Sequence, residues 1–135
     1  MNSEPCTHLP DNPIRVLWIP TDVRKDIEFT WIGNSLQAMQ NLVGGPLEIV
    51  PQAPMRYSLP KLDCGCNSVL VVNEDGHMTP NRANPRASYY YPGIVGNAFI
   101  VGEGLLRKIN GRGDDEMVFL SLSEDYGLKL IQATS

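Results

Sequence analysis

The chain has 135 residues and a formal net charge of −4, with 42% hydrophobic and 19% charged residues, which is the balance of a globular domain rather than a disordered chain. Its twelve glycines and eleven prolines argue against a helical bundle, because both residues interrupt helices. The excess of carboxylates argues against non-specific binding to nucleic acid and to anionic membranes.

Residues 1–13 contain three prolines and are expected to form an irregular arm in front of a single domain over residues 14–135. The domain begins with two predicted strands, 14–19 and 26–32. In the second strand apolar and polar residues alternate, which is the pattern of a half-buried strand. We expect the two strands to pair as a hairpin.

A short helix is predicted over residues 35–43. Asn34 or Ser35 can cap its first turn. Gly44 can adopt the left-handed conformation that ends a helix, and Pro46 cannot continue one.

Three more strands are predicted over residues 47–50, 68–73 and 94–101, each from a run of mostly apolar residues. A turn signal over residues 73–76 closes the middle strand. Residues 51–67 are expected to form a long loop.

A short apolar run over residues 117–120 precedes a predicted helix over residues 123–132. Ser121 and Glu124 stand in the spacing of a capping box at its start. Together the elements predict an α+β fold, a mainly antiparallel sheet with one or two packed helices.

Three short segments follow one another in a specific order along the chain. A helix ends in Val43-Gly44-Gly45, an Asn73-Glu74-Asp75-Gly76 turn follows, and the chain then reads Gly-Asn-Ala-Phe-Ile-Val-Gly over residues 96–102. In this order, over about residues 14–126, the chain resembles a family of small phage, prophage and plasmid proteins known as a domain of unknown function. The resemblance implies a phage or mobile-element setting, and therefore the cytoplasm of a host cell. It brings no established catalytic residues.

The segment between Asp75 and Glu103 contains no carboxylate, although the chain has 15. Its arginines could bind phosphate oxygens, its tyrosines could stack on a base, and its asparagines could form hydrogen bonds. In an extended run, Tyr89 and Tyr91 would share one face and Tyr90 would point away. The alternative is a polar loop whose tyrosines cover the sheet. The candidate ligand-binding residues are Asn81, Arg82, Arg86, Tyr89, Tyr91, Gly93, Gly96 and Asn97.

The cysteines raise the question of a metal site. Cys6, His8, Cys64 and Cys66 match the number of ligands in a structural zinc site. One residue separates the members of each pair, which is less than the usual two to four, so free thiols are the favoured interpretation and zinc stays the alternative. We expect no other cofactor.

These features favour a non-catalytic, phage-encoded protein that sequesters a nucleotide-type signalling molecule of host immunity, such as a cyclic oligonucleotide or an ADP-ribose derivative. One alternative is an inhibitor that blocks a host defence or DNA-processing enzyme by surface contact. A further alternative is a small nucleotide-degrading enzyme that uses Glu74, Asp75 and His77.

The hairpin also predicts self-association. Trp18, Phe29 and Trp31 add apolar area to a short pair of strands, so we expect a homo-oligomer. The N-terminal residues are polar and the longest apolar runs have four residues, so we expect no signal peptide and no contact with a membrane.

Overall fold

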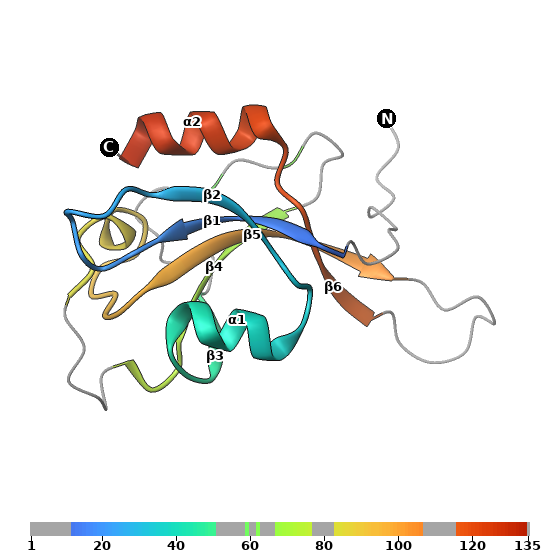
Figure 1. Ribbon diagram of the computed structural model, residues 1–135, viewed down its shortest axis with the longest axis horizontal. Helices are drawn as coiled ribbons and strands as arrows, with labels where there is room; N and C mark the ends of the chain where they lie inside the picture. The colour runs from blue at the N-terminus through green and yellow to red at the C-terminus, as the bar shows by residue number, and fades with distance from the viewer. Residues whose placement is uncertain are drawn as a thin grey trace.

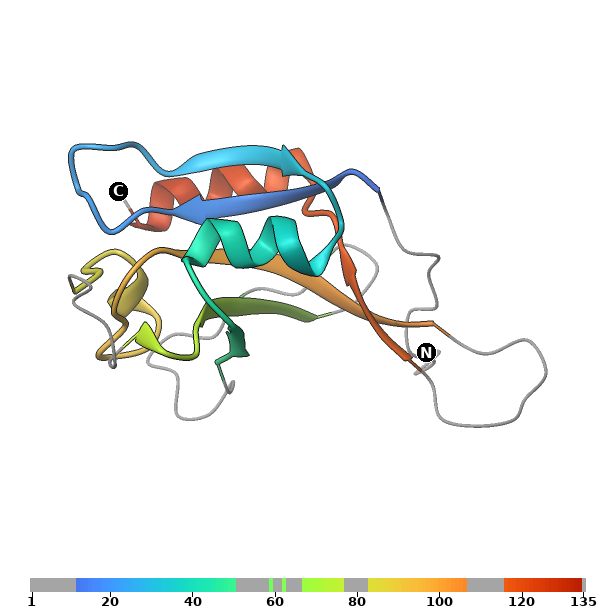
Figure 2. The same ribbon diagram turned by 60° about the horizontal axis from the view of Figure 1, so that its bottom comes forward.

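The computed structural model describes residues 12–50, 59, 62, 67–76, 83–106 and 116–134. Within these residues the chain forms an antiparallel six-stranded sheet in the order β2-β1-β5-β4-β3, with β6 paired to β5. The two α-helices lie on opposite faces of this sheet (Figures 1 and 2). The predicted α+β fold is therefore confirmed.

The strands and helices have the following bounds: β1 Ile14–Ile19, β2 Glu28–Ile32, α1 Leu36–Val43, β3 Leu47–Ile49, β4 Asn67–Asn73, the 3-10 helix η2 Ala87–Tyr89, β5 Ala98–Leu106, β6 Glu116–Leu120 and α2 Glu124–Thr134.

The predicted hairpin is confirmed, since β1 and β2 pair with Ile14 opposite Ile32. Alternation along β1 sends its side chains to two cores. Val16 packs with the core beside α1, whereas Leu17 packs with the core beneath α2. Both faces of the sheet are thus covered by a helix.

Helix α1 has the ends that the sequence predicts. The Ser35 side chain accepts a hydrogen bond from the backbone N–H of Ala38 at 3.2 Å. At the other end Gly44 adopts a left-handed φ of 85°, which is open to glycine at little cost. Met39 and Val43 are buried against the sheet.

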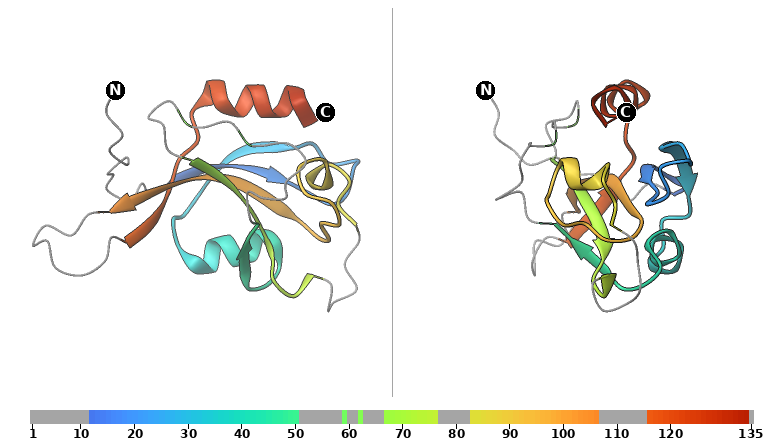
Figure 3. Two further views of the ribbon diagram at one scale, coloured as in Figure 1. Left: turned by 180° about the vertical axis from the view of Figure 1, so that it is seen from behind. Right: turned by 90° about the vertical axis from the view of Figure 1, so that its left-hand side faces the viewer.

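The predicted strand over residues 94–101 is wrong at its start, because β5 begins at Ala98 and continues to Leu106. Gly96 has a φ of 81°, which breaks the extended conformation. The carbonyl of Ile94 accepts a hydrogen bond from the backbone N–H of Asn84 at 2.9 Å. Residues 94–97 therefore belong to a loop, which lies with η2 at the end of the sheet where β5 begins (Figure 3, yellow).

The predicted capping box before α2 is also wrong. The cap is Ser123, whose Oγ accepts a hydrogen bond from the backbone N–H of Tyr126 at 3.2 Å. The Oγ of Ser121 accepts instead from the backbone N–H of Arg15, at 3.0 Å. Ser121 thus joins the start of α2 to β1.

Most of the predicted arm and of the predicted 51–67 loop lies outside the described residues. The division into an arm and one domain stays a prediction. Within the part of the chain that the structure describes, no helix is long and apolar enough to cross a membrane.

Candidate functional site

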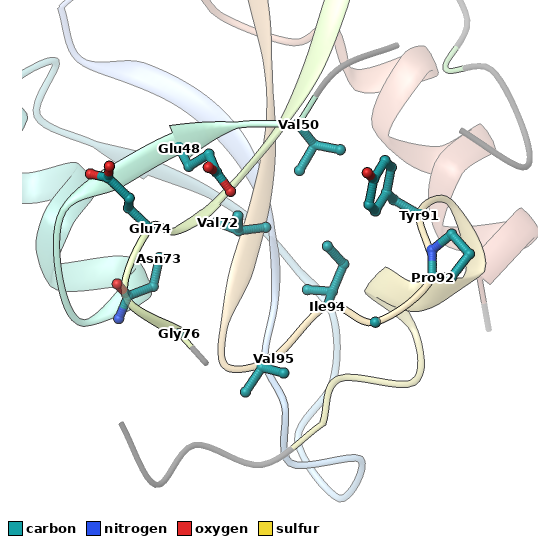
Figure 4. A pocket seen from close by; sticks show the side chains of 11 residues that line it. Glu48, Val50, Val72, Asn73, Glu74, Gly76, Tyr91, Pro92, Ile94 and Val95 are labelled. Carbon is teal, nitrogen blue, oxygen red and sulfur yellow. The ribbon is translucent and has the colours of Figure 1, made fainter. Parts of the chain in front are cut away.

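A pocket of about 290 Å³ lies between the β3–β4 edge of the sheet and the loop that precedes β5 (Figure 4). Its apolar floor belongs to the core on the α2 side of the sheet, to which Val50, Val72 and Ile94 contribute. The pocket is lined by Glu48, Val50, Val72, Asn73, Glu74, Gly76, Tyr91, Pro92, Gly93, Ile94 and Val95.

Glu48 reaches the pocket because of strand alternation. Its neighbours Leu47 and Ile49 pack into the core beside α1. Glu48 itself lies directly opposite Val72 on β4, on the other face. Its carboxylate points toward Val72 and the interior of the pocket, whereas the Glu74 carboxylate points away from Tyr91 (Figure 4). One carboxylate therefore faces an apolar floor and a tyrosine wall.

The loop that forms the second wall is held in place by Asn84, which is fully buried. The Asn84 side-chain nitrogen donates to the carbonyls of Ile19 and Gly96, both at 2.9 Å. Its Oδ1 accepts from the backbone N–H of Ala87 at 3.0 Å. A single side chain thus joins the end of β1, η2 and the turn before β5.

Arg86 makes a second link between the same regions. Its Nη2 donates to the carbonyl of Pro20 at 2.9 Å and to the carbonyl of Asp22 at 3.1 Å. The Asp22 carboxylate is bonded instead by Arg24, whose side chain and backbone N–H lower the Asp22 pKa to about 2. Arg86 therefore acts as a clamp on the connection between β1 and β2, and its guanidinium lies outside the pocket lining.

The predicted site residues separate into groups in the structure. Tyr91 and Gly93 line the pocket. Gly96 and Asn97 hold the loop, since the Gly96 carbonyl accepts from Asn84 and the Asn97 Oδ1 accepts from the backbone N–H of Thr21 at 2.9 Å. The prediction for Asn81 and Arg82 falls outside the described residues.

The predicted alternation of the three tyrosines is wrong, because η2 is helical there and not extended. Tyr90 is the buried one, at 2% exposure, and packs edge-on against Tyr89 with ring centroids 5.1 Å apart. Tyr89 is 37% exposed and does not line the pocket.

Sequence reasoning missed Glu48 and the valine floor. The available signal was the alternation of Leu47-Glu48-Ile49-Val50, which places Glu48 and Val50 on one face. Nothing in the sequence shows that this face meets the loop before β5, because that contact depends on tertiary packing.

The described residues do not form the site that either the acid–base alternative or the zinc alternative requires. Asp75 lies in the turn after β4, where its backbone N–H donates to Asn73 Oδ1 at 2.8 Å. His77, Cys6, His8, Cys64 and Cys66 lie outside the described residues. Among the residues that are described, no group of three or more His, Cys, Asp or Glu side chains could hold a metal ion.

Residues 14–127 match the family model described as Domain of unknown function (DUF3846). The chain belongs to this family. The resemblance to a domain of unknown function is thus confirmed, and the DUF3846 match includes β1 through β6 and the first turn of α2. No curated protein sequence matches the chain.

A crystal structure of the small RNA methyltransferase HEN1 is similar to this DUF3846 domain, with a TM-score of 0.59 and 18% sequence identity. The similarity covers 91% of this chain but 16% of the HEN1 chain. At this identity the similarity shows the fold alone: the DUF3846 chain follows the same path as one part of HEN1.

Proposed function

We propose that this DUF3846 protein binds a nucleotide-type small molecule without turnover, and that the nucleoside part of the ligand enters the pocket. The observation that carries the proposal is the arrangement of Tyr91, Val72 and Glu48 around one cavity. An aromatic wall and an apolar floor suit a flat ring. A carboxylate accepts hydrogen bonds from ring N–H groups or ribose hydroxyls.

The size of the pocket limits how much of the ligand it holds. Small-molecule sites begin at about 300 Å³, and the 290 Å³ found here suits one nucleoside. A cyclic oligonucleotide would place one base inside and the remainder at the surface. Arg82 stays the predicted contact for a phosphate of that remainder.

The biological role that fits is sequestration of a host immune signal in the cytoplasm of a host cell. The resemblance to phage, prophage and plasmid proteins supports this setting. Binding alone suffices for such a role, because each occupied pocket lowers the free concentration of the signal by mass action.

Isothermal titration with cyclic di- and trinucleotides, ADP-ribose derivatives and nucleosides tests the proposal. We expect one class to bind and to be recovered intact after denaturation. Tyr91→Ala should weaken binding roughly 5- to 150-fold, since a base–aromatic stack contributes about 1–3 kcal/mol. Tyr89→Ala is the matched control, because Tyr89 lies outside the pocket lining. Absence of binding by every class contradicts the proposal, and recovery of a converted ligand favours the enzyme alternative.

One exposed aromatic residue favours the second candidate function, inhibition of a host enzyme by contact. Trp31 is 55% exposed on the edge strand β2, with the Arg15 guanidinium carbon 5.4 Å from its ring centroid. Tryptophan and arginine are enriched where protein partners bind tightly. A partner recovered from host lysate by the wild type and lost with Trp31→Ala supports this function, and recovery of no partner opposes it.

A further inference from the structure

The polar side chains of the pocket determine which end of a ligand can enter. The lining residues supply the Glu48 carboxylate and the Tyr91 hydroxyl, whereas the Glu74 carboxylate points away from Tyr91. None of the described lining residues is a lysine, an arginine or a histidine. A phosphate beside the Glu48 carboxylate would place like charges together. The group that enters is therefore a neutral or cationic hydrogen-bond donor.

The setting of Glu48 narrows this choice further. Its carboxylate points over the apolar floor, and its position opposite Val72 places the side chain on that face of the sheet. The two oxygens of a carboxylate accept two parallel N–H bonds from a planar partner, and such charge-assisted pairs are stronger than neutral ones. The Tyr91 ring across the floor supplies a face for stacking a flat group.

The rim of the pocket leaves space for the rest of the ligand at Gly93. Gly93 has a φ of 85°, and no atom of the described residues lies within 4 Å of the position that a Cβ would take. A ring bound between Glu48 and Tyr91 can therefore continue past Gly93 to a substituent in solvent.

We propose that the pocket selects a planar group with two adjacent N–H donors, and that Glu48 is the residue that selects it. The guanine base of a nucleotide is such a group, because its ring N–H and its amino group lie side by side. For this ligand the inference rests on the proposed function. A guanidinium group offers the same pair of donors. Adenine presents a ring nitrogen acceptor beside its amino group, and that lone pair would face the carboxylate.

The test is titration of the full chain with guanosine, inosine, adenosine and agmatine, which carries a guanidinium group. Guanosine should bind, and inosine, which lacks the amino group, should bind roughly 10- to 150-fold more weakly. Adenosine should bind at least as weakly as inosine. Glu48→Gln should weaken guanosine binding by a similar factor, because the variant replaces one acceptor oxygen with a donor.

Glu28→Gln is the control, because Glu28 is also an exposed glutamate on an edge strand and lies outside the pocket. It should bind guanosine as the wild type does. Equal guanosine affinity in the wild type and Glu48→Gln overturns the role of Glu48, and equal binding of guanosine and adenosine overturns the selectivity. In both cases nucleotide binding still stands, and Tyr91→Ala tests whether it occurs at this pocket. Agmatine binding without guanosine binding, lost in Glu48→Gln, supports the selection and refutes a nucleotide ligand. Absence of all binding overturns both proposals.

Discussion

Asn84 stabilises the pocket loop through hydrogen bonds that no other residue type can reproduce in full. Its nitrogen donates to two carbonyls while its oxygen accepts from Ala87. We expect Asn84→Asp to lower the free energy of unfolding by about 3 kcal/mol at pH 7, since a buried carboxylate would face the carbonyls of Ile19 and Gly96.

The loss in Asn84→Asp should depend on pH. Burial and the two carbonyls raise the pKa of the new carboxyl in the folded state above its value in the unfolded chain. The folded state then binds more protons, so stability relative to the wild type falls as pH rises above about 4. Urea denaturation at pH 4 and pH 7 measures this. Asn97→Asp is the control: it keeps an acceptor for the Thr21 N–H and should lower the free energy of unfolding by less. An equal loss of stability in Asn84→Asp at both pH values would contradict this explanation.

Tyr126 gives the wild type its own alkaline sensitivity. Burial raises the Tyr126 pKa to about 12, and the hydrogen bond with Ser68 opposes this only in part. Because the folded pKa lies above the unfolded value of about 10, stability is complete below pH 10 and falls as pH rises from 10 to 12. Urea denaturation at pH 8 and pH 11 should show an added loss on the order of 1–2 kcal/mol in the wild type compared with Tyr126→Phe. Identical losses in both proteins would refute it.

Arg86 shows where prediction from residue types ends. Arginine suits phosphate, and a carboxylate-free segment made that interpretation reasonable. The carbonyls of Pro20 and Asp22 that occupy its Nη2 lie more than 60 residues earlier in the sequence. Local sequence cannot reveal such partners, and in Arg86→Ala these hydrogen bonds would be absent. Loss of these bonds should destabilise the loop.

At the scale of elements, the packing of α2 reverses the usual effect of a helical glycine. Alanine normally stabilises a helix interior by about 1 kcal/mol relative to glycine. Here a Cβ on Gly127 would lie 2.7 Å from the Phe29 ring. The guanidinium carbon of Arg15 lies 3.9 Å from the centroid of the same ring and limits how far the ring can move. Gly127→Ala should therefore destabilise the protein by about 1–3 kcal/mol.

Thermal and urea denaturation of Gly127→Ala measure this effect. Leu128→Ala is the neighbouring control, because Leu128 is 51% exposed and should change stability by about 0.5 kcal/mol or less. A Gly127→Ala variant as stable as the wild type would show that α2 or Phe29 shifts freely.

Elements with local signals could be predicted from the sequence, and elements that depend on distant partners could not. The β1–β2 hairpin followed from alternation, and α1 followed from Ser35 and Gly44. The start of β5 and the cap of α2 were missed for one reason. Asn84 donates to the carbonyls of Ile94 and Gly96, and the backbone N–H of Arg15 donates to the Ser121 Oγ; these tertiary hydrogen bonds override the local patterns.

At the scale of the molecule, both sheet faces are covered, so association would use an edge. Strand β2 is one edge of the sheet and carries the exposed Trp31, whereas Trp18 donates to the Leu42 carbonyl at 3.3 Å beside α1. We expect a dimer through β2, with twice the 14.9 kDa mass of the chain. Light scattering should give the dimer mass for the wild type and for the control variant Leu36→Lys, and the monomer mass for Trp31→Lys. A wild-type monomer refutes the dimer.

The candidate site could be predicted only on one side. Tyr91 and Gly93 stood out because aromatic and glycine residues in a loop suit ligand binding. Glu48 and the floor residue Val72 belong to the other side of the pocket, which exists because β3 pairs with β4 and the loop before β5 folds across them. A pocket built by two distant segments has no signature in either segment alone.

The hydrogen bonds of Asn84 and Arg86 have a kinetic consequence for any ligand of this pocket. They fix the loop before the ligand arrives, so association requires no ordering of the chain. The encounter itself then limits the association rate. In stopped-flow mixing, the observed rate constant should rise in proportion to ligand concentration without reaching a plateau, and differences in affinity among ligands should reside in how slowly each one leaves.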